Sequence, residues 1–199
     1  MTAPEFTALL LLCTAASFTP GPNTTLSTAL AANGGLKSAI GFVLAVPVGW
    51  ALLFSLCAGG VGALVLAAPA LRLAITFFGV GYLLWLAYKL LGVKSTFQIE
   101  RSRLDVTFGQ GVLLQFLNIK AWMLALTVVA GWLAGRTDQW QRFAVVLPVL
   151  LLFALASNLS YALMGSLLRE WLAQGQRLPW FNRGMAAVLV LTALWMATL

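Results

Sequence analysis

Six long apolar runs follow one another along the chain and constrain its fold more than any other feature. Each holds about the 20 mostly apolar residues that an α-helix needs to cross a bilayer. The runs cover roughly residues 6–32, 38–66, 71–91, 108–134, 143–168 and 182–199. The pattern predicts an all-α membrane protein with six transmembrane helices in a single domain, residues 1–199.

The composition excludes a soluble domain. Hydrophobic residues make up 61% of the chain and charged residues only 9%, whereas an ordinary globular domain is about 25% charged. The net charge of +7 comes from basic residues that stand singly at the ends of apolar runs. Such charges set the topology of a membrane protein, so we expect the lipid bilayer and no nucleic acid as a partner.

The N-terminal run imitates a signal peptide but lacks its charge. Glu5 precedes the apolar stretch, and no Lys or Arg does, whereas a cleaved signal begins with a basic segment. We therefore expect this run to be retained as the first half of a transmembrane helix.

Lys and Arg are distributed unequally between the two sides of the predicted bundle. One side collects Lys37, Lys89, Lys94, Arg101, Arg103, Arg169, Arg177 and Arg183, and the other Arg72, Arg136 and Arg142. The positive-inside rule makes the first side cytoplasmic. The prediction is a multi-pass protein of the bacterial inner membrane with both termini outside the cytoplasm.

The predicted spans fall into two halves of three. Half 1 covers about residues 1–93, a cytoplasmic loop about 94–107, and half 2 about 108–199. Because three spans are an odd number, the halves must be inserted in opposite orientations, as in inverted-repeat transporters. The sequence therefore predicts a 3+3 inverted repeat.

The first span of each half is interrupted by polar residues near mid-depth. In half 1 the interruption is residues 19–23, where Pro20 and Pro22 remove backbone donors and Gly21 permits unusual dihedrals. In half 2 it is residues 115–120, which place Lys120 about 12 residues into its span. Unpaired carbonyls at this depth are costly unless they face a cavity, water or a ligand. Broken first and fourth helices are therefore predicted.

Lys120 is the central candidate for a binding site. No acidic residue lies deep in any run, and a buried ammonium without a partner is costly. A cation beside the positive ends of half-helices would bind an anionic group, and unpaired carbonyls nearby would take an ammonium. The predicted ligand is a small zwitterion. The candidate site residues are Lys120, Asn118, Asn23, Pro20, Gly21, Pro22, Gln115, Asn158 and Tyr161.

The weaker candidates have a packing alternative. Asn158 and Tyr161 are three residues apart and share a helix face, which suits either a site wall or half-buried packing. Cys13 and Cys57 lie inside apolar runs and are expected to pack. The chain contains no His, which disfavours an enzyme or a metal site. We expect no cofactor, and a homo-oligomer stays open.

The chain carries several short motifs. They are residues 18–23, the 34–41 turn, the aromatic residues 81–86, residues 116–121, Gln115, residues 57–59 and the pattern of Asn158, Tyr161 and Gly165. Together they resemble the motifs of the LysE/RhtB family of amino-acid exporters, especially its cysteine/O-acetylserine branch. Where the family has Asn-Pro-Lys, this chain has Asn118-Ile119-Lys120. The resemblance implies efflux of a neutral amino acid or derivative, driven by the proton-motive force, as in an antiporter. Export of homoserine, threonine or lysine, and a non-transporting partner subunit, are the alternatives.

Overall fold

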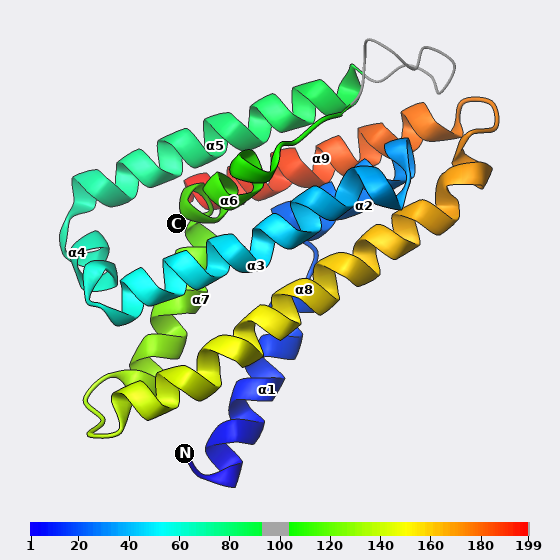
Figure 1. Ribbon diagram of the computed structural model, residues 1–199. Helices are drawn as coiled ribbons and strands as arrows, with labels where there is room; N and C mark the ends of the chain where they lie inside the picture. The colour runs from blue at the N-terminus through cyan, green and yellow to red at the C-terminus, as the bar shows by residue number, and fades with distance from the viewer. Residues whose placement is uncertain (93–103, 199) are drawn as a thin grey trace.

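The computed structural model describes residues 1–92 and 104–198, and this part of the chain is helical without strands. Figure 1 shows its helices in chain order. They are α1 (Ala3–Phe18), α2 (Pro22–Gly34), α3 (Leu36–Ala58), α4 (Val61–Ala67), α5 (Pro69–Leu91), α6 (Phe108–Leu117), α7 (Ile119–Val128), the π-helical η1 (Val129–Leu133), α8 (Gln139–Leu172) and α9 (Arg177–Ala197).

Four of these helices, α3, α5, α8 and α9, are long and apolar enough to cross a membrane. A fifth candidate span consists of α6 followed by α7 and η1, which are bent by 68° at their junction. The apolar helix α1 has only 16 residues. The chain is therefore a multi-pass membrane protein with four to five candidate spans in the described residues, and the arrangement of six spans as 3+3 stays a prediction.

The interruption in the first apolar run is confirmed. Helix α1 ends at Phe18, and α2 begins at Pro22 after an extended Gly21. Proline suits the first position of a helix because its missing N–H has no partner there in any case. The prolines also explain why α1 ends, since Pro20 and Pro22 cannot donate to the carbonyls of Ala16 and Phe18, four residues earlier.

The interruption in the fourth run is also confirmed, and it arises without a proline. Asn118 has an extended backbone, with φ −98° and ψ 99°, and it separates α6 from α7. Its side-chain oxygen accepts a hydrogen bond of 3.2 Å from the backbone N–H of Lys120. This is an N-terminal cap, for which Asn is among the preferred residues. Asn118 therefore starts a new helix where Ile119 alone would have allowed the old one to continue.

The second predicted span, residues 38–66, was wrong as a single helix. Helix α3 ends at Ala58, and the separate short helix α4 follows from Val61. Gly60 between them has φ 96°, a left-handed conformation that ends helices and favours glycine. The remaining predicted boundaries differ from the observed helix ends by a few residues. Helix α8 extends beyond its predicted span of residues 143–168 at both ends, since it covers Gln139–Leu172.

The predicted cytoplasmic loop falls largely outside the described residues. Its residues 94–103 are not described, among them Lys94, Arg101 and Arg103 of the charge argument. Residues 104–107 are described and are not helical. Thr107 then caps α6 by accepting from the backbone N–H of Gln110.

Helices far apart in the sequence pack against one another in pairs. In Figure 1, α5 lies beside α9, and α8 runs beside α2 and α3. At Gly165 of α8, an added Cβ would lie 2.3 Å from the carbonyl oxygen of Thr28, so only glycine allows α8 to approach α2 this closely. At one end of the bundle, the amides of Asn33 and Asn182 exchange hydrogen bonds of 2.9 and 3.0 Å.

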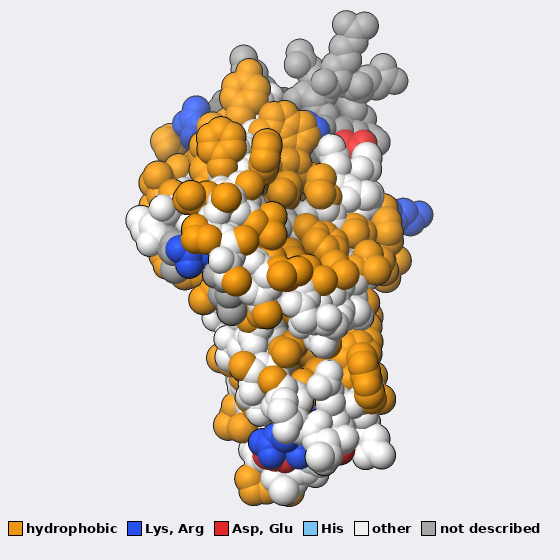
Figure 2. All heavy atoms as spheres, turned by 90° about the vertical axis from the view of Figure 1, so that its left-hand side faces the viewer, with side chains coloured by type: hydrophobic (Ala, Val, Ile, Leu, Met, Phe, Trp, Pro, Cys, Tyr) orange, Lys and Arg blue, Asp and Glu red, His pale blue; other side chains and the backbone are white. Residues whose placement is uncertain are grey.

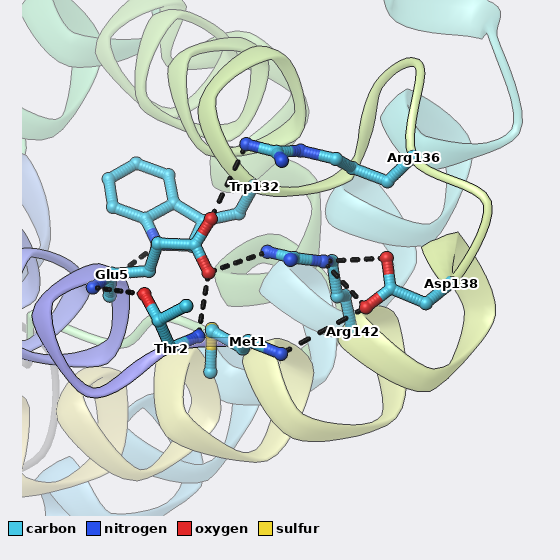
Figure 3. Close-up of polar contacts among 7 residues, drawn as sticks. All are labelled: Met1, Thr2, Glu5, Trp132, Arg136, Asp138 and Arg142. Atoms are coloured by element: carbon cyan, nitrogen blue, oxygen red, sulfur yellow. Dashed lines mark hydrogen bonds and ion pairs between the residues drawn. The ribbon is translucent and has the colours of Figure 1, made fainter.

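A cluster of charged residues holds the start of α1 at the opposite end. Glu5 forms ion pairs with Arg142 at 3.2 Å and Arg136 at 3.4 Å, and Arg142 also pairs with Asp138 at 2.8 Å (Figure 3). The indole N–H of Trp132 donates to the Glu5 carbonyl. Figure 2 shows basic and acidic side chains gathered at the lower end of the molecule, with apolar side chains over much of the face above.

Candidate functional site

A cavity of about 70 Å³ lies where the two helix breaks meet. This volume is several times the roughly 10–15 Å³ that one buried water requires, so the cavity has room for a small organic molecule. The described residues that line it are Cys13, Ala16, Ser17, Thr19, Gly21, Pro22, Asn23, Thr24, Trp50, Asn118, Lys120, Ala121, Leu124, Leu150, Ala154, Ser157 and Asn158. The walls thus come from both broken spans and, in addition, from α3 and α8.

The two breaks come into contact through Lys120 and Gly21. The Nζ atom of Lys120 lies 3.6 Å from the position that a Cβ on Gly21 would occupy. Lys120 is half-buried, and its ammonium forms no hydrogen bond or ion pair with any described residue. None of the described residues that line the cavity is acidic. A half-buried cation in this setting requires water or an anion from outside the chain.

Helix ends add partial charges to the cavity. Pro22, Asn23 and Thr24 form the first turn of α2, and Lys120 lies in the first turn of α7. The N-termini of both helices therefore direct positive partial charge toward the cavity, which favours an anionic group. Ser17 lies in the last turn of α1, whose C-terminal carbonyls carry negative partial charge. The helix ends thus favour an anionic group at the starts of α2 and α7 and a cationic group at the end of α1.

Side chains satisfy the carbonyls that the breaks leave without backbone partners. The Tyr161 hydroxyl donates to the Phe18 carbonyl at 3.0 Å, replacing the N–H that Pro22 lacks. In the second break, the backbone N–H of Lys120 bonds the Asn118 side chain, so the Phe116 carbonyl loses its helical donor. The indole N–H of Trp122 donates to that carbonyl instead, at 2.8 Å. Both breaks are therefore built into the fold.

The four predicted amide side chains differ in how they are engaged. Asn23 and Gln115 hydrogen-bond each other in both directions. Asn158 accepts from Ser27 at 2.8 Å and donates to a backbone carbonyl of its own helix. Asn118 accepts from the Lys120 backbone, but its NH₂ group has no partner among the described residues. Asn118 is thus the amide whose whole NH₂ group is unpaired among the described residues and can donate to a ligand.

The structure brings most of the predicted site residues to the cavity wall. Those that line it are Lys120, Asn118, Asn23, Gly21, Pro22 and Asn158. Pro20, Gln115 and Tyr161 do not line it. Gln115 and Tyr161 support it from behind, through Asn23 and the Phe18 carbonyl respectively. Pro20 contributes to the site only by ending α1, since it has no N–H to continue the helix.

Sequence reasoning missed the cavity residues contributed by apolar segments. Trp50 of α3 and Ser17 of α1 both line the cavity, and so does Cys13, which was expected only to pack. Ser17 stands directly before the first break, and this position could have identified it. Trp50 carries no such signal, because a tryptophan in an apolar run fits lipid, core and cavity equally well.

The chain is similar to a family of known membrane translocators. The LysE type translocator family matches residues 14–199. A cysteine/O-acetylserine efflux protein of Klebsiella pneumoniae is 28% identical over 197 residues, which cover 97% of each chain. Proteins of the same description from Salmonella typhimurium and Escherichia coli are 27% identical over 154 residues (77% of this chain, 78% of the relative) and 24% identical over 181 residues (91% and 89%). No solved structure matches the chain significantly. The family resemblance predicted from the motifs is confirmed, and the chain belongs to the LysE type translocator family.

Proposed function

We propose that this protein exports small neutral amino acids or their derivatives, similar to cysteine and O-acetylserine, from the cytoplasm. The observation that carries the proposal is the unpartnered ammonium of Lys120 in a cavity formed by two broken helices. Membership of a translocator family and the efflux function in the names of its relatives support it.

The substrate carboxylate binds Lys120 and the free NH₂ group of Asn118. Both belong to the N-terminal end of α7, whose dipole adds to the attraction. The substrate ammonium faces the carbonyls at the end of α1. Asn23, held by Gln115, shapes the wall between them, and Pro20, Gly21 and Pro22 keep the first break open. Asn158 on α8 closes the other side, and Tyr161 supports the site from behind through the Phe18 carbonyl.

Transport proceeds by alternating access around this site. In the proposed topology, α1 and α2 together form the first of six spans, and the two halves form a 3+3 inverted repeat. The end that carries Lys37, Arg169 and Arg177 faces the cytoplasm of a bacterial cell, and both termini lie outside it. The proton-motive force drives export, and Lys120 is the group that changes protonation, since it is the one ionisable cation among the described cavity residues.

The test is efflux from proteoliposomes loaded with labelled cysteine, O-acetylserine, homoserine, threonine or lysine, with and without a proton gradient. We expect flux of the first two compounds to require the gradient and to fall at least about tenfold in Lys120→Met. Lys37→Met is the matched control, because Lys37 lies outside the cavity. Normal flux in Lys120→Met at normal expression would refute the site. No flux of any compound in the wild type would favour a non-transporting partner subunit.

A further inference from the structure

The polar side chains that line the cavity fall into two groups. Those of Thr19, Asn23, Thr24, Ser157 and Asn158 are hydrogen-bonded within the protein. Those of Lys120, Asn118, Trp50 and Ser17 keep a donor without a partner among the described residues. Lys120 and Asn118 are assigned above to the carboxylate. Trp50 and Ser17 come from α3 and α1 and have no assigned role.

Close packing holds the backbone of α3 next to Trp50. The preceding residue, Gly49, presses against α6, where an added Cβ would lie 2.5 Å from the Gln115 side chain and 3.0 Å from the Val112 carbonyl oxygen. Trp50 itself is only 9% exposed. The backbone of α3 is thus held against α6 next to Trp50, whose largely buried side chain lines the cavity.

The indole N–H of Trp50, a residue that lines the cavity, has no hydrogen-bond partner among the described residues. Among the described side chains, the fully enclosed polar atom that lacks a partner is the Tyr82 hydroxyl. The indole nitrogen of Trp50 also has no partner, yet it is not enclosed in that way. An indole N–H can only donate, and a buried donor without an acceptor costs about 1–3 kcal/mol. An acceptor that enters the cavity beside Trp50 would satisfy this donor.

We propose that Trp50 recognises the side chain of the substrate by donating its indole N–H to an oxygen or sulfur acceptor. The inference rests on the proposed function and narrows its substrate class. The cavity would select small neutral amino acids whose side chain carries such an acceptor, as in an ester, hydroxyl or thiol. It would bind aliphatic amino acids of the same size less well, because these leave the donor unpaired. Ser17, whose hydroxyl can donate or accept, lies in the same wall.

The experiment compares Trp50→Phe with the wild type in proteoliposomes. Labelled O-acetylserine is the substrate, and unlabelled O-acetylserine and homoleucine, an aliphatic amino acid with a side chain of the same size, compete with it. Phenylalanine keeps an aromatic ring but removes the donor. We expect the wild type to prefer O-acetylserine by about tenfold or more, and Trp50→Phe to reduce the preference to about twofold through weaker binding of O-acetylserine alone. The matched control is Trp140→Phe, since Trp140 is 68% exposed and does not line the cavity.

The outcomes separate this inference from the proposed function. An unchanged preference in Trp50→Phe, or an equal loss of affinity for both compounds, would overturn the role of Trp50. The wild-type comparison tests the claim even if the variant fails to fold, because equal affinity for O-acetylserine and homoleucine would also overturn it. If the wild type moves none of the amino acids, it is the proposed function that fails.

Discussion

The side-chain amides of Asn23 and Gln115 hydrogen-bond each other in both directions. Asn23 Nδ2 lies 2.8 Å from Gln115 Oε1, and Gln115 Nε2 lies 3.1 Å from Asn23 Oδ1. Asn23 stands just after the first helix break and Gln115 just before the second, and Gln115 is fully buried. The pair therefore joins the two broken spans directly and fixes how the breaks face each other across the cavity.

The first prediction concerns the energy of this pair. Gln115→Leu and Asn23→Leu each leave one amide without its partner, so each should destabilise the protein by about 1–3 kcal/mol. The double variant should lose less than the sum, with a coupling energy of about 0.6–1.7 kcal/mol, as found for hydrogen bonds between membrane helices. Reversible unfolding of the wild type, the two single variants and the double variant in mixed micelles measures this coupling energy. Additive losses would show that the two amides act independently.

A second prediction tests the close approach of α5 to the second break. A Cβ on Gly79 would lie 2.0 Å from the Leu117 carbonyl oxygen, which belongs to the backbone and cannot move aside freely. Gly79→Ala should therefore cost at least about 1–3 kcal/mol of unfolding free energy through overpacking. Gly81→Ala on the same helix is the control, because an added Cβ there meets no atom within 4 Å. Equal thermal stability of the two variants would contradict the packing.

The sequence predicted the two breaks because their causes are local. Pro20, Gly21 and Pro22 disrupt a helix wherever they occur in its interior. Lys120 was informative for another reason, since an ammonium in mid-span needs a polar surrounding. The turn at Gly60 also has a local cause. The prediction of an unbroken second span was wrong because it followed the length of the apolar run and gave too little weight to the Gly-Gly pair within it.

The partners of these residues could not be predicted from the sequence, because they depend on tertiary packing. Nothing local indicates that Gln115 would pair with Asn23, or that the Tyr161 hydroxyl would replace the N–H that Pro22 lacks. Trp50 is the clearest case. Its role depends on α3 lying against α6 at Gly49, a contact between helices from different halves of the chain.

A third prediction concerns the charged cluster at the start of α8. The hydrogen bond from the Arg142 guanidinium to Asp138, and its positive charge, hold the pKa of that carboxyl below its usual value. A depressed pKa means that the pair stabilises the fold above the unfolded pKa of about 3.9 and that this stabilisation is lost as the pH falls through the folded value. Asp138→Asn removes it at every pH.

Melting temperatures between about pH 6 and pH 3 measure this effect. The wild type should be more stable than Asp138→Asn at pH 6, and the difference should begin to shrink as the pH falls below about 4. Asp105→Asn is the control, because Asp105 is exposed and forms no ion pair with a described residue. A difference between wild type and Asp138→Asn that stays constant over this range would mean that the ion pair does not contribute.

The last prediction concerns Tyr161, whose hydroxyl satisfies the Phe18 carbonyl at the end of α1. Tyr161→Phe removes only the hydroxyl, and Pro22 has no N–H to replace it, so the carbonyl stays unpaired beside the cavity. We expect a loss of about 0.5–1.5 kcal/mol in unfolding free energy and slower efflux, because the end of α1 is then less firmly held against α8. Tyr88→Phe is the matched control, since Tyr88 is 76% exposed and its hydroxyl has no partner among the described residues. If Tyr161→Phe unfolds and transports like Tyr88→Phe, the hydrogen bond does not hold the first break in place.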